Sequence, residues 1–138
     1  MRNRFYVDTS VWRDYFEDRK DGLRPLGEFA FEFLKKCKRE KSKIIVSDVV
    51  FEELSLEFSK TQQEMLLSEF EELIIRVLHS RKQEQEAFSL LRKFNRAFPL
   101  ADVLHSVIAR DESAVLVSRD FHFKQIGLVD VFLPEELL

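Results

Sequence analysis

The sequence predicts an α/β fold, in which a central parallel sheet of about five strands is flanked by helices on both faces. Short runs of strand-forming residues alternate along the chain with longer segments of helical periodicity, as is typical of parallel sheets. Gly and Pro number only three each, which favours long regular elements over a loop-rich sandwich. Of the 138 residues, 45% are hydrophobic, so we expect one domain over residues 1–138 with a substantial core.

The first part of the chain is predicted to contain one strand and two helices. Residues 5–7 are large and apolar and run directly into Asp8, the pattern of a buried strand that ends in a polar turn. An apolar stripe over residues 11–16 indicates a short amphipathic helix. Pro25 suits the first turn of a second helix, and the apolar positions of residues 26–37 follow helical spacing throughout.

The middle of the chain is predicted to contain a second strand and a pair of helices. Residues 43–47 are apolar and again end in a hydroxyl followed by an acid. We expect a helix from 48 to about 58 and another from Thr61, which together form an α-hairpin over residues 48–73. Residues 74–78 fit a third strand, although the same run also fits a continuation of the preceding helix.

The last part of the chain completes the alternation of helices and strands. Residues 81–95 have helical periodicity, and Pro99 begins a further helix whose core positions fall within residues 100–108. The run at 114–117 is a clear buried strand, and a last short strand is expected at 129–132.

Acidic residues recur where the predicted strands end. Asp8, Asp48 and Asp120 each lie just beyond the carboxyl end of a strand, and Glu53 and Asp102 lie in helices at that edge. Right-handed crossovers gather those strand ends on one side of the sheet, where ligands of parallel α/β proteins bind. Clustered carboxylates repel one another by roughly 3 kcal/mol per pair, so the pattern favours a bound cation. Oxygen ligands without cysteine indicate Mg²⁺ or Mn²⁺.

Each of these acids also has a structural interpretation. Asp8 or the hydroxyls after it are suited to cap the next helix, and Asp102 is placed to complement a helix dipole. Helical phase separates two neighbouring glutamates, because Glu53 borders the apolar line of its helix whereas Glu52 lies about 200° from it. We therefore expect Glu53 to face packed structure and Glu52 to face water.

The histidines and the cysteine give weaker signals. His105 lies three residues after Asp102, and a hydrogen-bonded histidine at the margin of the core is favoured over a helper role in the site. His79 and His122 have no partners at ligand spacing and are assigned no role. Cys37 falls on the core line of its helix and is expected to be a small buried apolar residue.

Charge and composition limit the partners and the compartment. The net charge is −3, so binding to a polyanion must rely on a local basic patch or on bound cations. A lone cysteine fits a reducing cytoplasm. No apolar run reaches membrane-spanning length, and residues 1–4 lead into a strand rather than a signal peptide, so we expect a cytoplasmic protein without membrane contact.

Several other classes of α/β protein lack their required residues here. No glycine-rich phosphate loop is present, which excludes P-loop and dinucleotide-binding sites. A phosphoaspartyl hydrolase needs a second acid where Ser10 stands. A receiver-type signalling domain needs paired acids at the first strand and a lysine after a strand near the end of the chain. Here Ser118-Arg119-Asp120 stand where that lysine would be.

Four segments together resemble the blocks of a PIN domain, in that family's order and at about its spacing. They are Val7–Ser10, Val46–Ser47 with Glu53–Leu54, Pro99–His105, and Leu116–Asp120 with Phe123. The resemblance covers essentially the whole chain. It implies that the family's acidic quartet corresponds to Asp8, Glu53, Asp102 and Asp120, with Ser10 and Ser118 as supporting hydroxyls.

Small PIN proteins of this size are similar to the VapC-type toxins of toxin–antitoxin pairs. The resemblance implies a cytoplasmic Mg²⁺- or Mn²⁺-dependent endoribonuclease with an RNA substrate, commonly a homodimer inhibited by an antitoxin. The helices at 11–16 and 48–73 would offer the antitoxin groove and the dimer surface. Two alternatives stay open: an RNA-processing nuclease without an antitoxin, and a non-catalytic scaffold that binds protein or RNA. Arg119 is interpreted either as a substrate contact or as a surface charge.

Overall fold

The computed structural model describes residues 3–138. Met1 and Arg2, part of the segment expected not to be a signal peptide, lie outside the described residues. The sheet has five parallel strands, as the sequence predicts, and their order is β3-β2-β1-β4-β5. Its strands are β1 (Arg4–Val7), β2 (Lys43–Ser47), β3 (Ile74–Val77), β4 (Val115–Val117) and β5 (Val131–Phe132).

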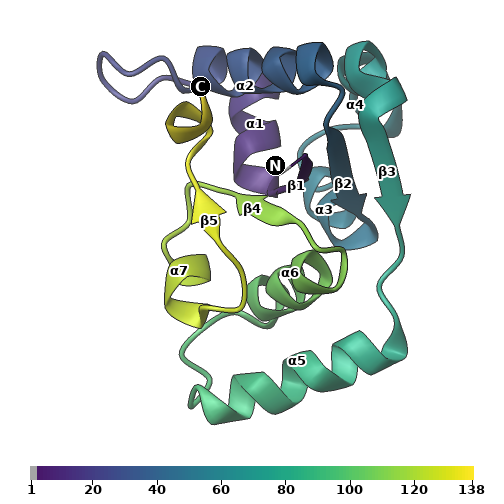
Figure 1. Ribbon diagram of the computed structural model, residues 1–138, viewed down its shortest axis with the longest axis vertical. Coiled ribbons are helices and arrows are strands. Elements are labelled where there is room, and N and C mark those ends of the chain that lie inside the picture. The colour runs from purple at the N-terminus through teal and green to yellow at the C-terminus, as the bar shows by residue number, and fades with distance from the viewer. Residues whose placement is uncertain (1–2) are drawn as a thin grey trace.

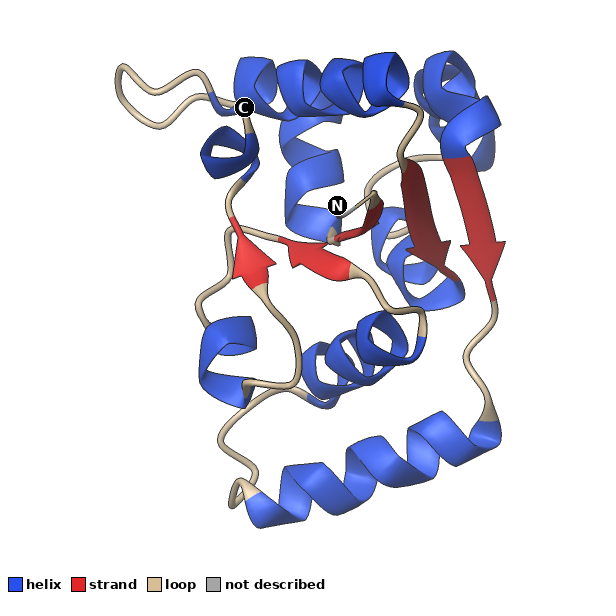
Figure 2. Cartoon of the chain, viewed as in Figure 1, coloured by secondary structure: helices blue, strands red, loops and turns tan. Residues whose placement is uncertain are grey.

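Helices connect every pair of successive strands and cover both faces of the sheet (Figure 2). The α-helices are α1 (Thr9–Glu17), α2 (Leu26–Glu40), α3 (Asp48–Leu54), α4 (Lys60–Leu67), α5 (Arg81–Lys93), α6 (Leu100–Asp111) and α7 (His122–Ile126). There are also two 3₁₀ helices in the described chain. η1 (Ser68–Leu73) precedes β3, and η2 (Pro134–Leu137) is the last element.

The strand order reverses direction between β1 and β4, and this reversal determines where a site can form. From β1 the chain advances to β2 and β3, and it then returns to place β4 on the other side of β1. Helices α1 and α2 therefore lie on the opposite side of the sheet from α5, α6 and α7 (Figure 1). Connections that leave β1 and β4 toward opposite faces open a crevice at the carboxyl ends of these strands.

The core follows from strands that are buried on both faces. Tyr6 of β1 lies between Ile45 of β2 and Leu116 of β4, and all three side chains are fully buried. Continuous apolar runs of this kind are what a covered parallel sheet requires. Cys37 is buried as expected, and this burial raises the pKa of its thiol to about 12.

The structure corrects two predicted boundaries in the α-hairpin. The helix expected to reach about residue 58 ends at Leu54, and Ser59, with an extended backbone, then caps α4. The Ser59 hydroxyl accepts a hydrogen bond from the Gln62 amide at 3.1 Å, and the Gln62 side chain accepts one from the Ser59 amide at 2.8 Å. The second helix then tightens into η1 before β3, so the strand interpretation of residues 74–78 is confirmed.

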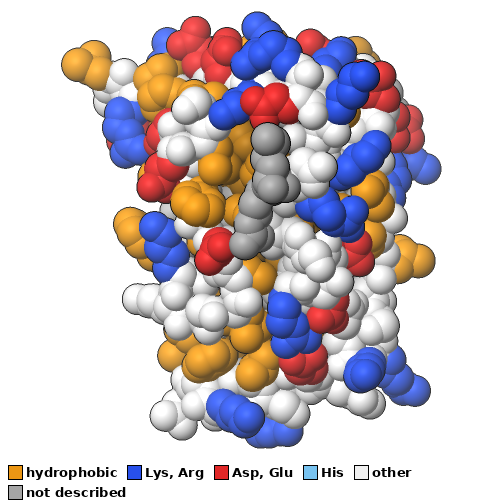
Figure 3. Space-filling model, viewed as in Figure 1, with side chains coloured by type: hydrophobic (Ala, Val, Ile, Leu, Met, Phe, Trp, Pro, Cys, Tyr) orange, Lys and Arg blue, Asp and Glu red, His pale blue; other side chains and the backbone are white. Residues whose placement is uncertain are grey.

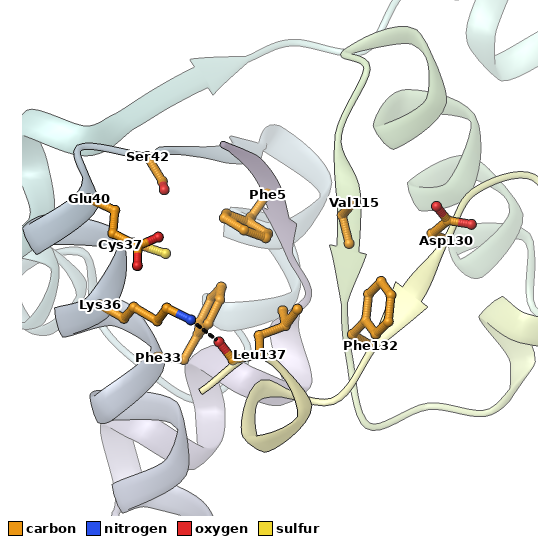
Figure 4. Close-up of a pocket in the computed structure, with 10 residues that line it drawn as sticks. All are labelled: Phe5, Phe33, Lys36, Cys37, Glu40, Ser42, Val115, Asp130, Phe132 and Leu137. Atoms are coloured by element: carbon orange, nitrogen blue, oxygen red, sulfur yellow. Dashed lines mark hydrogen bonds between the residues drawn. The ribbon is translucent and has the colours of Figure 1, made fainter. Parts of the chain in front are cut away.

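One apolar pocket lies away from the acidic edge. A pocket of about 300 Å³ lies between α2 and the sheet, and the rings of Phe5, Phe33 and Phe132 line it (Figure 4). The Lys36 ammonium at its margin donates to the Leu137 carbonyl at 2.7 Å. Phe5 lies near the amino-terminal end of β1, so this pocket is remote from the carboxyl ends of the central strands.

The surface shows no broad field of one charge on the face seen in Figure 3, where basic and acidic side chains are interspersed. This distribution agrees with the small net charge of −3. Across residues 3–138, none of the helices is both long enough and apolar enough to cross a bilayer.

A histidine between two acids ties the start of α5 to the start of α3. His79 Nδ1 lies 2.8 Å from Asp48 and its Nε2 lies 3.2 Å from Glu84. Burial alone would lower the pKa of His79, but the hydrogen bonds and charges of the two acids together raise it.

We expect His79 to make stability depend on pH. A pKa raised by folding contributes stability that is complete below the unfolded pKa and is lost as pH rises through the folded pKa. Urea unfolding should therefore show that His79→Gln lowers the free energy of unfolding more at pH 5.5 than at pH 8.5. The loss should stay below about 1 kcal/mol because the pair is partly exposed. An equal loss at both pH values would show that His79 is uncharged in this contact.

Candidate metal centre

Asp8 stands at the switch point between β1 and β4, and hydrogen bonds from both sides fix its carboxylate. It is the N-cap of α1, as the structural interpretation expected, and it is also held by the loop after β4. Its Oδ2 accepts from the Ser10 amide at 3.3 Å, the Ser10 hydroxyl at 2.8 Å and the Ser118 hydroxyl at 2.9 Å. Ser10 and Ser118 thus support this carboxylate directly. These three donors all contact the same oxygen, Oδ2.

Glu53 approaches Asp8 from the end of α3. Its Oε1 accepts hydrogen bonds from the Thr9 hydroxyl at 2.6 Å and from His105 Nε2 at 2.8 Å. The same His105 nitrogen lies 4.0 Å from the Asp8 Oδ1. Burial would raise the pKa of Glu53, but His105 and Thr9 outweigh it and lower the pKa, so the carboxylate is ionised at neutral pH. Glu52 is exposed, as helical phase predicts.

A buried chain of hydrogen bonds orients His105, which is only 1% exposed. The Tyr6 hydroxyl lies 2.6 Å from the Ser47 hydroxyl and 2.5 Å from His105 Nδ1. One assignment satisfies every group: Ser47 donates to Tyr6, Tyr6 donates to Nδ1, and Nε2 donates to Glu53. Burial would lower the pKa of His105, but the contacts with Glu53 and Asp8 raise it. His105 is therefore both a core residue, as expected, and a support for Glu53.

A second acidic group lies across the crevice, where the start of α6 meets the loop after β4. His122 Nδ1 lies 2.8 Å from the Asp102 Oδ2 and 3.3 Å from the Asp120 Oδ1. The Asp120 amide donates to the Ser118 hydroxyl at 2.9 Å, so Ser118 links this group to Asp8. Burial is the main cause that raises the pKa of Asp102; the charges of Asp120 and Asp8 add to it, while the His122 hydrogen bond opposes it.

The structure therefore brings the four predicted acids to one edge of the sheet, in two adjoining groups. Within each group the potential ligand atoms lie within 4.8 Å of one another. The groups are Asp8, Glu53 and His105, and Asp102, Asp120 and His122. The four carboxylates come from segments spread over more than 100 residues of the chain. Their mutual repulsion is what a bound cation relieves.

The donor set fits a hard divalent cation. Carboxylate oxygens dominate it, and Cys37 lies elsewhere in the core. Among residues 3–138, no hydrogen-bond donor contacts the Asp8 Oδ1, so this oxygen is available as a ligand. Carboxylates are the preferred protein ligands of Mg²⁺ and Mn²⁺.

The sequence interpretations of His122, His79 and Asp48 need correction. The sequence shows no partner of His122 at ligand spacing and predicts no role for it, yet His122 contacts Asp102 and Asp120. His79 also has partners, and Asp48, the strand-end acid that it contacts, belongs to neither acidic group. The position of His122, two residues after Asp120, was a signal for a shared turn; nothing local in the sequence links His79 to Asp48.

Arg119 is neither a free surface charge nor an exposed substrate contact. Its side chain is 14% exposed and donates to Asp14 at 2.6 Å and to both Glu135 oxygens at 2.9 and 3.0 Å. Its amide donates to the Ser10 hydroxyl at 3.3 Å. The loop that carries Ser118 and Asp120 is thus anchored to α1 and to η2.

The strand order and the acidic crevice at the switch point define a class of α/β proteins with an acidic site at the carboxyl ends of the strands. The PIN domain family matches the chain over residues 5–128, and the chain belongs to this family. No curated protein sequence matches the chain.

Solved structures share the fold at low sequence identity. VapBC2 from Rickettsia felis, bound to promoter DNA, matches with a TM-score of 0.69 and 19% identity, over 93% of this chain and 96% of that one. A toxin–antitoxin complex from Klebsiella pneumoniae matches with a TM-score of 0.65 and 19% identity, over 95% of this chain and 96% of that one. VapC20 from Mycobacterium tuberculosis, a toxin that cleaves the sarcin–ricin loop, matches with a TM-score of 0.65 and 18% identity. The match covers 92% of this chain and 98% of that one. At these identities the likeness concerns the fold.

Proposed function

We propose that this PIN protein is a metal-dependent endoribonuclease, the toxin of a VapBC-type pair. The observation that carries the proposal is the convergence of Asp8, Glu53, Asp102 and Asp120 at the switch point of a PIN fold. Structural neighbours that are toxins, one of them described as cleaving the sarcin–ricin loop, support the choice of RNA as substrate.

The residues divide into cation ligands and groups that position them. Asp8, Asp102 and Asp120 would hold Mg²⁺ or Mn²⁺, which when bound supplies stabilisation of the charge that develops on the phosphodiester. Ser10 and Ser118 keep the Asp8 carboxylate in one orientation. Glu53 is ionised, and within the described chain only its Oε1 receives hydrogen bonds, so Oε2 can accept one from a water near the phosphate.

The direct test is cleavage of single-stranded and structured RNA by the purified protein with Mg²⁺, Mn²⁺ or a chelator. We expect internal cleavage with either cation and none with the chelator, because the acids alone provide no positive charge for the phosphodiester. Cleavage that persists in chelator would contradict the metal assignment. Binding without cleavage under every condition would favour the non-catalytic scaffold.

Glu53→Gln should lower the rate of cleavage by about ten- to a hundred-fold, the usual effect of losing a group that orients a metal site. Glu52→Gln is the matched control, since it makes the same change one residue away on the exposed side of α3. Its rate should stay within about two-fold of the original, and both rates are measured on one RNA at saturating Mn²⁺. The opposite ranking would show that the helical phase of α3 does not place the functional acid.

We also propose that the protein is a cytoplasmic homodimer that an antitoxin peptide inhibits. Large apolar side chains are exposed around α3 and α4, among them Leu56 at 84% and Met65 at 71%. Light scattering at micromolar concentration should give the mass of two chains, and Met65→Lys should shift it toward one. A single-chain mass for the unaltered protein would contradict the dimer.

A further inference from the structure

A second cavity of about 300 Å³ adjoins the metal centre and has no part in the functions assigned above. It lies between the turn that joins α1 to α2, the loop after β4, the start of α7 and strand β5. Ser118 and Asp120 form part of its wall. The cavity therefore opens beside the carboxylates and not at a separate surface. Its volume is at the lower end of the range for small-ligand sites.

The lining of this cavity is mainly apolar and includes one exposed aromatic ring. Leu26, Val131 and Leu133 contribute aliphatic side chains. Phe121 follows Asp120 directly, lines the cavity and is 77% exposed. An aromatic face next to a phosphodiester-cleaving centre is suited to stack a nucleobase, because every base presents a π face.

The charged side chains around the cavity differ in their availability. The Arg24 and Arg119 guanidiniums both pair with Glu135, at 3.1 and 2.9 Å, and Arg119 also pairs with Asp14. Lys124 is exposed at the cavity wall, and no ion pair is formed by its ammonium within residues 3–138. The arginines therefore hold the wall together, while Lys124 remains available to a phosphate.

We propose that this cavity, the base pocket, receives an unstacked nucleobase of the RNA next to the cleaved bond, with Phe121 as the stacking surface and Lys124 on the adjoining phosphate. The inference rests on the proposed function and adds the substrate subsite. Since the arginines in the wall are already paired, recognition relies on stacking and tolerates any base. A base in double-stranded RNA must leave the RNA helix before it can enter the base pocket, so the pocket selects single-stranded or loop nucleotides.

An abasic scan tests the base pocket. A single-stranded RNA with one cleavage site is prepared intact and with a single abasic nucleotide at each position near that site. With the unaltered protein, one abasic position should lower kcat/KM by about ten-fold, the scale of one stacked base. Phe121→Ala should lower kcat/KM on intact RNA by the same factor and should show no further loss at that position. Phe121→Trp keeps a planar face and should retain both rates.

Matched variants separate the pocket from general surface effects. Phe88→Ala removes another exposed ring, on α5, and should behave as the unaltered protein. In an Asp102→Asn background, Lys124→Gln should reduce the slope of log affinity against log salt by about 0.7, the value for one phosphate of a single strand. Lys43→Gln, at the amino-terminal end of β2, should leave this slope unchanged.

The outcomes distinguish the base pocket from the nuclease assignment. If the unaltered protein cleaves no RNA, the proposed function fails and the base pocket fails with it. If it cleaves RNA and Phe121→Ala keeps both the rate and the abasic penalty, only the base pocket is overturned. Loss of inhibition by a co-purified antitoxin in Phe121→Ala, with unchanged cleavage, would instead assign this surface to a protein partner and overturn the inference.

Discussion

Asp102→Asn should lower metal-dependent RNA cleavage by about a thousand-fold or more. A metal ion supplies several kcal/mol of transition-state stabilisation, and each 1.4 kcal/mol corresponds to about a factor of ten in rate. The side chain keeps its shape but loses its charge. The negative charge that Asp8, Asp102 and Asp120 together present to a cation is thereby reduced. Single-turnover cleavage with Mn²⁺ measures the effect.

The stability of the same variant separates loss of metal from loss of fold. Burial and neighbouring charges raise the pKa of Asp102, so its ionised form opposes folding at neutral pH. In chelator, the midpoint of thermal unfolding of Asp102→Asn should therefore equal or exceed that of the unaltered protein. Added Mn²⁺ should raise this midpoint for the unaltered protein and leave the variant unchanged. Asp111→Asn makes the same change at the other end of α6 and is the control variant. Undiminished cleavage by Asp102→Asn would reject the assignment of Asp102 as a metal ligand.

Arg119→Met should lower the free energy of unfolding by about 3–5 kcal/mol, the cost of leaving a buried acid without its partner. Asp14 is 3% exposed, and burial raises the pKa of Asp14 even with Arg119 in place. The loss should be smaller at pH 5 than at pH 7, because a raised pKa lets Asp14 take up a proton as the pH falls. Urea unfolding at the two pH values measures it.

Two further variants interpret that result. Asp14→Asn in the Arg119→Met background should recover part of the stability, since the unpaired charge is gone. Arg76→Met removes an exposed pair with Glu71 at 3.0 Å and should cost less than about 1 kcal/mol. If Arg119→Met cost no more than Arg76→Met, the loop after β4 would not depend on this anchor.

The fold was predictable because its strands and helices carry strong periodic signals. Residues 5–7 and 114–117 read as buried strands, and helical phase correctly separated the half-buried Glu53 from the exposed Glu52. The helix boundary at Leu54 was not predicted because the apolar spacing of Val50, Leu54 and Phe58 continues beyond the end of the helix.

The site was predictable as a set of acids but not as a network. Positions at strand ends follow from topology, so Asp8 and Asp120 could be assigned to one edge before any contact was known. The partners of His105 and Arg119, and the Asp102 that His122 contacts, lie on other elements of the chain, and local periodicity does not predict these contacts. The base pocket likewise depends on four segments that only the folded chain brings together.

The most direct test of the acidic centre is anomalous scattering from a crystal soaked in Mn²⁺. We expect a manganese peak at the switch point between β1 and β4, within about 2.2 Å of carboxylate oxygens of Asp8, Asp102 and Asp120. A crystal at saturating Mn²⁺ with no peak there, or with Asp8 and Asp102 too far apart to share one ion, would contradict the assignment of this edge as a metal centre.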